Sequence, residues 1–123
     1  MDSKGTILVA DDDKLITAMA VFRLEREGYK VVTAEDGKEA LRLIQSIKPD
    51  LIISDLMMPY FSGLELVEHL RDNLQSSIPI IILSASGQEK TVMRAFKLGA
   101  DDFITKPFSL EELLMRIKKL LRK

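Results

Sequence analysis

The chain has 123 residues, 46% of them apolar and 30% charged, so its length fits one domain and its composition indicates a globular rather than a disordered chain. The formal net charge of −1 gives no whole-chain argument for binding nucleic acid or a membrane surface, and the absence of cysteine excludes disulfides and thiolate chemistry. No apolar run approaches the roughly 20 residues that cross a bilayer, and Met1–Gly5 lacks the apolar core of a secretory signal, so we expect a soluble, cytoplasmic protein.

Five short apolar runs predict strands. Most are rich in Ile, Val and Leu without clean alternation, which is typical of strands covered on both faces in a parallel sheet. In chain order the predicted strands are Thr6–Ala10, Tyr29–Ala34, Asp50–Ser54, Pro79–Ser84 and Asp102–Thr105.

Segments with helical spacing follow each of these runs. The first ends at Gly28, and the last begins with Ser109 and Glu112 at the spacing of a capping box. In the first segment four apolar residues share one helix face: Leu15, Ala18, Met19 and Phe22. The predicted helices are Lys14–Glu27, Lys38–Ile47, Gly63–Leu74, Gln88–Leu98 and Ser109–Arg122.

The order of elements is therefore a strand and a helix repeated five times, in one domain over residues 1–123. Parallel strands need right-handed crossovers, which place helices on both faces of the sheet. Sheets of this kind bind ligands at the carboxyl ends of their strands. We therefore ask which side chains stand directly after each strand.

Acidic, hydroxyl and basic side chains stand at four of these strand ends. An aspartate run, Asp11–Asp13, follows the first strand, Asp55 follows the third, Ser84 ends the fourth, and Lys106 follows the fifth. Carboxylates held close together repel one another and need a cation or a proton, and hard oxygen ligands favour Mg²⁺ or Mn²⁺. A carboxylate, a metal, an ammonium and a hydroxyl together predict a site where a phosphoryl group passes to an oxygen nucleophile.

Simpler interpretations exist for each of these residues. An aspartate run after a strand is more often a turn or a helix cap than a metal site, and we interpret Asp13 as the N-cap of the first helix. Ser84 has the alternative of bonding only to loop backbone, and Lys106 of being a solvated turn residue. The single histidine, His69, is expected on the exposed side of the third helix.

Four segments at these strand ends resemble the receiver domains of two-component response regulators. They appear in the family's order and span essentially the whole chain. The segments are Ile7–Asp13, Asp50–Pro59 with Ser62-Gly63 after it, Ile80–Ser86, and Gly99–Phe108. The resemblance implies a doubly wound, flavodoxin-like (βα)5 fold with five parallel strands and five helices.

The resemblance also implies a role for each site residue. Asp55 would be the phosphoacceptor. Asp11, Asp12 and Asp55 would hold Mg²⁺ or Mn²⁺ together with the backbone carbonyl of Met57. Ser84 would bind a phosphoryl oxygen, Lys106 would pair with the phosphoryl charge, and the Lys106–Pro107 bond resembles the family's cis peptide.

The same resemblance implies a signalling cycle. The donor would be a phosphohistidine on a histidine kinase or a histidine phosphotransfer protein. Phosphorylation would draw Ser84 inward and let the aromatic residue Phe103 fill the vacated space, which would switch the surface of helix four, strand five and helix five. That surface would control a downstream effector or a fused output domain. Met57 stands where the family tunes phosphate loss, and its apolar side chain cannot orient water, so we expect slow self-hydrolysis.

The last helix resembles receivers joined to winged-helix DNA-binding domains, which often dimerise through paired charges. Asp102, Glu112 and Arg116 fit that pattern, but Val92 and Lys97 stand where charged partners for Glu112 and Lys118 are expected. We therefore expect a monomer or a weak phosphorylation-dependent dimer, with no direct contact of this domain with nucleic acid or a membrane.

Two other functions compete with a phosphoacceptor signalling module that is not a turnover enzyme. A phosphatase or phosphotransferase that turns over an aspartyl phosphate commonly has a second acid two residues after the nucleophile, where this chain has Met57, and the chain has no cap segment. A nucleotide- or flavin-binding protein would need a glycine-rich phosphate loop after the first strand. Three aspartates stand there instead and would repel phosphates.

Overall fold

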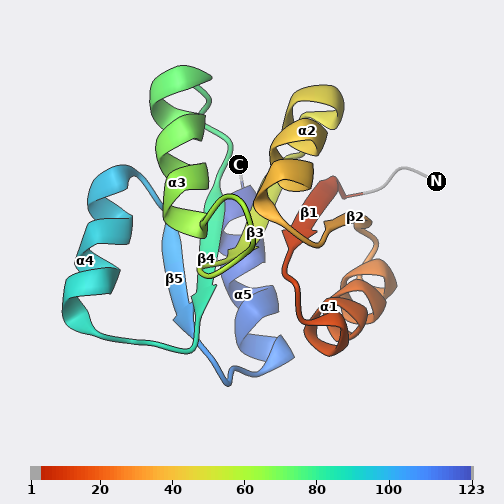
Figure 1. Ribbon diagram of the computed structural model, residues 1–123. Coiled ribbons are helices and arrows are strands. Elements are labelled where there is room, and N and C mark those ends of the chain that lie inside the picture. Colours follow the sequence, from red (N-terminus) through yellow and green to blue (C-terminus); the bar gives the residue numbers. More distant parts are fainter. Residues whose placement is uncertain (1–3, 123) are drawn as a thin grey trace.

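The computed structural model of the protein describes residues 4–122 (Figure 1). The start of the segment Met1–Gly5, which we expect not to be a secretory signal, lies outside the described residues. The chain forms one five-stranded sheet in the order β2-β1-β3-β4-β5, with all strands parallel. The strands are β1 (Thr6–Ala10), β2 (Lys30–Ala34), β3 (Leu51–Asp55), β4 (Ile80–Ser84) and β5 (Asp102–Thr105). The helices are α1 (Lys14–Arg26), α2 (Gly37–Ile47), α3 (Gly63–Glu68) continued by η1 (His69–Asn73), α4 (Glu89–Leu98) and α5 (Leu110–Leu121).

The helices cover both faces of the sheet, as the uninterrupted apolar strands predict (Figure 1). Alternate residues of β1 show how the two cores form. Leu8 packs into a core with α2, α3 and α4, whereas Ile7 and Val9 pack into a second core with α1 and α5. Because both faces are buried, the strand shows no apolar–polar alternation. The (βα)5 architecture predicted from the sequence is confirmed, and within residues 4–122 no helix is both long and apolar enough to span a membrane.

Side-chain caps fix where four of the helices begin. Asp13 accepts hydrogen bonds from the backbone N–H groups of Leu15 and Ile16, which confirms it as the N-cap of α1. Asp36, Ser62 and Ser109 cap α2, α3 and α5 in the same way. The helix α4 follows Gln88, whose side chain makes no capping hydrogen bond.

The third helix departs from the prediction of one regular helix over Gly63–Leu74. After Glu68 the chain widens into the π-helical turn η1, which ends with the N–H of Leu74 donating to the carbonyl of His69. His69 is half-buried, not exposed as predicted, because its ring packs edge-on against Phe61 at a centroid distance of 5.9 Å. Periodicity cannot detect the extra residue of a π-turn, since the flanking apolar spacing still suits a helix.

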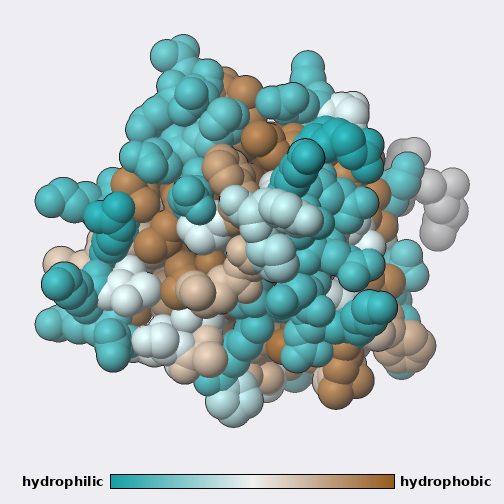
Figure 2. All heavy atoms as spheres, viewed as in Figure 1, coloured by the Kyte–Doolittle hydropathy of each residue, from teal (hydrophilic) through white to brown (hydrophobic). Residues whose placement is uncertain are grey.

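The apolar stripe of α1 recognised in the sequence faces solvent. Leu15 is 69% exposed and Phe22 64%, whereas Ala20 and Leu24 are the buried residues of this helix. Figure 2 shows apolar atoms at the surface over α1. Two stripes on α1 have helical spacing, and only packing against the sheet and α5 selects which of them is buried.

Candidate functional site

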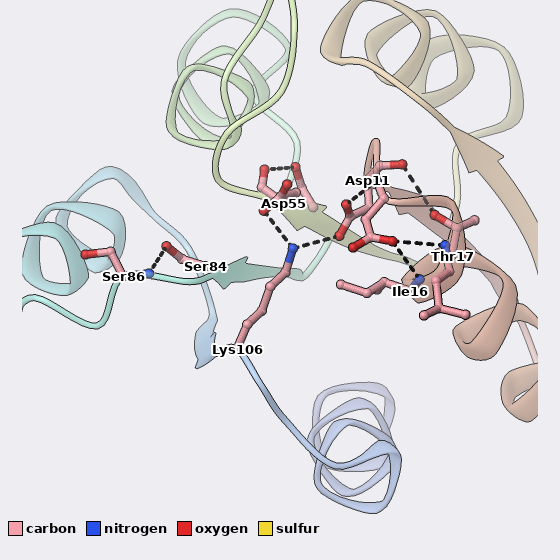
Figure 3. Close-up of polar contacts among 10 residues, drawn as sticks. Asp11, Ile16, Thr17, Asp55, Ser84, Ser86 and Lys106 are labelled. Atoms are coloured by element: carbon pink, nitrogen blue, oxygen red, sulfur yellow. Dashed lines mark hydrogen bonds and ion pairs between the residues drawn. The ribbon is translucent and has the colours of Figure 1, made fainter.

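Lys106 joins two carboxylates at the carboxyl edge of the sheet. It follows β5, and its Nζ lies 3.2 Å from Oδ2 of Asp11 and 3.2 Å from Oδ1 of Asp55 (Figure 3). Asp11 follows β1 and Asp55 is the last residue of β3, and these two strands are neighbours in the sheet. The Lys106–Pro107 peptide bond is cis, as the resemblance implies. The parallel register thus brings three residues from distant parts of the chain to one point.

The first aspartate of the run is held by backbone contacts. Asp11 is 1% exposed, and its Oδ1 accepts a hydrogen bond from the N–H of Asp13 at 2.9 Å. Thr17 donates from its hydroxyl to the Asp11 carbonyl at 3.3 Å, a contact that strand-end reasoning missed because Thr17 lies inside α1. Asp12, between Asp11 and Asp13, is exposed. The three aspartates therefore differ: Asp11 is buried, Asp12 faces solvent, and Asp13 caps α1.

Asp55 lies in surroundings that disfavour its charge. Asp55 is 8% exposed, and this burial raises the pKa of its carboxyl group above the ordinary value. The negative charge of Asp11 raises the pKa further, and the attraction of Lys106 does not cancel the two effects. Burial lowers the pKa of the Lys106 ammonium, but the carboxylates of Asp11 and Asp55 outweigh it, so that pKa is raised overall. Lys106 therefore stays charged, and a further cation beside Asp55 would stabilise the charged form of its carboxylate.

The donor set fits a divalent cation. Carboxylate oxygens of Asp11, Asp12 and Asp55 lie within 4.8 Å of one another. Three acidic groups with one ammonium between them leave an excess of negative charge, and hard oxygens are the ligands that Mg²⁺ and Mn²⁺ prefer. These three residues are therefore a candidate metal site, open to solvent on the side of Asp12.

Ser84 stands at the end of β4, beside β3. It is 2% exposed, and its hydroxyl accepts a hydrogen bond from the N–H of Ser86 at 3.0 Å (Figure 3). This is the loop-backbone contact that the simpler interpretation of Ser84 anticipates. A hydroxyl that accepts one hydrogen bond still has a proton to donate, so the contact leaves Ser84 able to bind a phosphoryl oxygen.

The loop between β3 and α3 borders the site on its other side. Met57 lies two residues after Asp55 in this loop, and its side chain is 73% exposed. Gly63 begins α3 directly against the end of β3, and a Cβ at this position would lie 2.5 Å from the Asp55 carbonyl oxygen. A larger residue at position 63 would therefore displace either the loop or Asp55.

The proposed switch residue and its neighbours lie beyond the site. Phe103 is 9% exposed and packs in the core under α2, α3 and α4. The charges considered for a dimer are paired within the chain: Arg116 contacts Asp102 at 2.6 Å and Glu112 at 3.1 Å. A subunit interface through these charges would have to share or replace the internal pairs.

Comparison with known proteins gives one consistent result. The family model described as the response regulator receiver domain matches residues 7–118. The alkaline phosphatase synthesis transcriptional regulatory protein PhoP of Bacillus subtilis is 44% identical over 95% of this chain and 48% of its own length. The phosphate regulon transcriptional regulatory protein PhoB of Pseudomonas aeruginosa is 46% identical over 96% of this chain and 52% of its own length. The chain thus spans about half the length of these curated relatives.

Solved structures agree with the sequence relatives. The receiver domain of the Francisella response regulator 1452 superposes with a TM-score of 0.91 at 42% identity, covering 96% of this chain and 97% of that one. The chemotaxis response regulator CheY4 of Vibrio cholerae superposes with a TM-score of 0.87 at 34% identity, covering 94% of this chain and 97% of that one. Both likenesses extend over nearly the whole of each chain.

Proposed function

The chain belongs to the response regulator receiver domain family, the signalling module of two-component response regulators, and from this premise we propose that Asp55 is the residue that accepts the phosphoryl group. One observation carries the proposal. Lys106 places its Nζ 3.2 Å from both Asp55 and Asp11, in a cluster that Asp12 completes. Among these acids, Asp55 is the one at the end of the middle strand β3, near Ser84 and Lys106, and its pKa is raised.

The phosphoryl transfer to Asp55 is a displacement at phosphorus. An oxygen of the ionised Asp55 forms the new P–O bond while the P–N bond of a phosphohistidine breaks, and the imidazole leaves with that electron pair and takes up a proton. Lys106 pairs with the phosphoryl charge, and the Ser84 hydroxyl donates a hydrogen bond to a phosphoryl oxygen. Asp11, Asp12, Asp55 and the backbone carbonyl of Met57 would hold Mg²⁺ or Mn²⁺, which would supply positive charge that offsets the charges of the carboxylates and of the phosphoryl oxygens.

The donor would be a histidine kinase or a histidine phosphotransfer protein. A hollow of about 340 Å³ opens beside Lys106, lined among others by Ile16, Met19 and Phe108. Its apolar lining next to a phosphoryl-binding ammonium suits a protein surface that presents a phosphorylated side chain. This hollow supports a protein donor over a free small metabolite.

The phosphate would act as a signal rather than as a step in turnover. We propose that the phosphoryl group draws Ser84 inward, lets Phe103 shift, and changes the surface formed by α4, β5 and α5. Turnover of a metabolite is disfavoured because Met57 stands where aspartyl-phosphate enzymes commonly have a second acid. The apolar Met57 side chain also supports a long-lived phosphate.

The relatives named as transcriptional regulatory proteins are about twice as long as this chain. This supports a receiver domain over residues 1–123 that controls a fused output domain. We propose that it acts in the cytoplasm, on such a domain or on a separate effector. We propose that any contact with DNA is made by such an output domain, and that the receiver is a monomer or a weak phosphorylation-dependent dimer. The internal pairing of Arg116 with Asp102 and Glu112 supports weak rather than strong dimerisation.

Incubation with acetyl phosphate and MgCl₂ tests the proposed chemistry. Mass spectrometry should show a phosphoryl adduct that requires the metal and is absent from Asp55→Asn. Beryllium fluoride should give a matching adduct by NMR. Equal adducts on the parent and on Asp55→Asn, or none on either with the metal present, would exclude Asp55 as the acceptor.

A further inference from the structure

The loop from Leu56 to Ser62 is fastened at both ends and in its middle. The N–H of Leu56 donates to the carbonyl of Leu83 and the N–H of Gly63 donates to that of Leu56, each at 2.8 Å. In the middle, the N–H of Gly37 donates to the carbonyl of Pro59 at 3.3 Å. Figure 1 shows this loop passing beside the N-terminal end of α2. The loop that carries Met57 therefore rests against a helix from another part of the chain.

The contact between this loop and Gly37 leaves no room for a side chain. A Cβ on Gly37 would lie 2.8 Å from the carbonyl carbon of Phe61, and closer still to the Phe61 carbonyl oxygen and Cβ. Carbon atoms at van der Waals contact lie roughly 3.5–4.0 Å apart. The backbone of Gly37 does not have the left-handed conformation that favours glycine. Close approach of the loop is therefore what requires glycine at position 37.

The helix side of this contact is rigid. Asp36 accepts a hydrogen bond from the N–H of Glu39 at 2.8 Å, and Glu39 accepts one from the N–H of Glu35 at 3.2 Å. Ala40 and Ile44 are buried against the sheet. Because α2 is capped at this end and packed along its length, a side chain at position 37 would move the loop and not the helix.

The loop side of the contact is held in an unfavourable conformation. Tyr60, next to Phe61, has φ of +71° and is 80% exposed. A non-glycine residue keeps such a conformation only where its surroundings fix it. The path of the loop from Met57 to Phe61 is thus set by its packing.

We propose that Gly37 is a positioning residue for the metal site: by admitting the loop to close contact with α2, it sets where the Met57 carbonyl meets the carboxylates of Asp11, Asp12 and Asp55. This inference rests on the proposed function, in which that carbonyl is a metal ligand. A Cβ at position 37 would push Phe61 and Pro59 away from α2 and shift Met57 with them. Groups that orient metal ligands typically change metal affinity by about 10- to 100-fold when altered.

The test is the affinity for Mg²⁺ alone, measured by titrating MgCl₂ into ¹⁵N-labelled protein and following the amide signals of Asp12 and Met57. Gly37→Ala should bind Mg²⁺ about tenfold more weakly than the parent. The matched control is Gly28→Ala: Gly28 has φ of +101° and lies between α1 and β2, and the atoms nearest to a Cβ there belong to the Lys4 side chain at 3.6 Å. This control should lower the urea midpoint and leave the Mg²⁺ affinity unchanged.

A rescue variant separates positioning from general loss of structure. Phe61→Gly removes one overlapping atom and frees the backbone at position 61, so adding Gly37→Ala to it should cost no more than about threefold in Mg²⁺ affinity. This pair also decides the matter if Gly37→Ala alone does not fold. A tenfold loss between Phe61→Gly and the double variant, or equal affinities of the parent and Gly37→Ala, would overturn the inference while leaving the proposed function intact. A parent that binds no Mg²⁺ would overturn both.

Discussion

Lys106 and Asp55 stand 51 positions apart in the chain, yet the Lys106 ammonium donates to the Asp55 carboxylate at 3.2 Å. The same ammonium contacts Asp11 at an equal distance, and Asp12 completes the acidic cluster. One ammonium thus offsets only part of the negative charge of three carboxylates at the edge of the sheet. Repulsion among the three carboxylates destabilises the folded protein when no metal is bound. We attribute this cost to the function of the site, because the fold does not need these charges.

Asp55→Asn should therefore stabilise the metal-free protein. The raised pKa of Asp55 shows that its charge is disfavoured in the folded protein. The amide removes this charge while its oxygen can still accept from Lys106, and we expect the free energy of unfolding to rise by about 1 kcal/mol. Urea unfolding followed by circular dichroism with a chelator present measures this. Asp13→Asn is the control, because asparagine caps a helix as well as aspartate does and should change little. A less stable Asp55→Asn protein would contradict the prediction.

Met57→Asn should shorten the lifetime of the phosphorylated protein. Met57 is exposed beside Asp55, and an amide at this position can hold a water molecule near the acyl phosphate, which a thioether does poorly. We expect hydrolysis several-fold faster than in the parent, followed on phosphate-affinity gels after the donor is removed. Met57→Leu should keep the parent lifetime. The idea fails if Met57→Asn and the parent lose phosphate at the same rate.

Phe103→Ala should separate phosphorylation from the response of the surface of α4, β5 and α5. The site does not use the Phe103 ring, so Asp55 should still be modified, but the cavity left in the core would cost about 3 kcal/mol. Amide shifts in α4 and α5 on adding beryllium fluoride and Mg²⁺ should be much smaller than in the parent. Ile104→Val, which alters the opposite core, should respond normally. A full response in Phe103→Ala would remove Phe103 from the switch.

Arg71→Met should be among the most destabilising single changes outside the two cores. From η1, Arg71 donates to the carbonyls of Gly99, Ser76 and Ile78 at 3.1, 2.8 and 2.9 Å. It also pairs with Asp101 at 2.8 Å. We expect a loss of about 3 kcal/mol in urea unfolding, because three carbonyls and a carboxylate each lose a hydrogen bond from the guanidinium. Arg42→Met removes only an exposed pair at 3.9 Å from Glu39 and should cost no more than about 0.5 kcal/mol; similar losses in the two variants would contradict this role.

Gln88→Asp should stabilise the start of α4. This helix begins without a side-chain cap, and an aspartate at the N-cap can accept from the free N–H groups of the first turn. The expected gain is about 1 kcal/mol, with stronger protection of the first amides of α4 in hydrogen exchange. Gln88→Ala should bring no such gain. If hydrogen exchange at the start of α4 is unchanged in Gln88→Asp, the N–H groups of the first turn of α4 do not gain a hydrogen bond from the new side chain, which would contradict the prediction.

The architecture was predictable because its causes are local. Residues 7–9 are apolar on both faces of their strand, which predicts a parallel sheet whatever surrounds it. The capping role of Asp13 also follows from the residues next to it. The sequence could not predict which stripe of α1 is buried, because Leu15 and Leu24 both have helical spacing and only the neighbouring elements distinguish them. The π-turn at His69 escaped prediction for a similar reason.

The order of residues along the chain was enough to predict that carboxylates, a hydroxyl and an ammonium stand at the ends of parallel strands, because each of these residues ends or directly follows an apolar run. The packing of strands, helices and loops, by contrast, is what places Lys106 between Asp11 and Asp55, exposes Asp12 to solvent, and brings the loop after Asp55 against Gly37. The contacts that place Lys106 and the loop join residues 22 to 95 positions apart in the chain. Distances of this kind depend on how the sheet and helices pack, which no short stretch of sequence specifies.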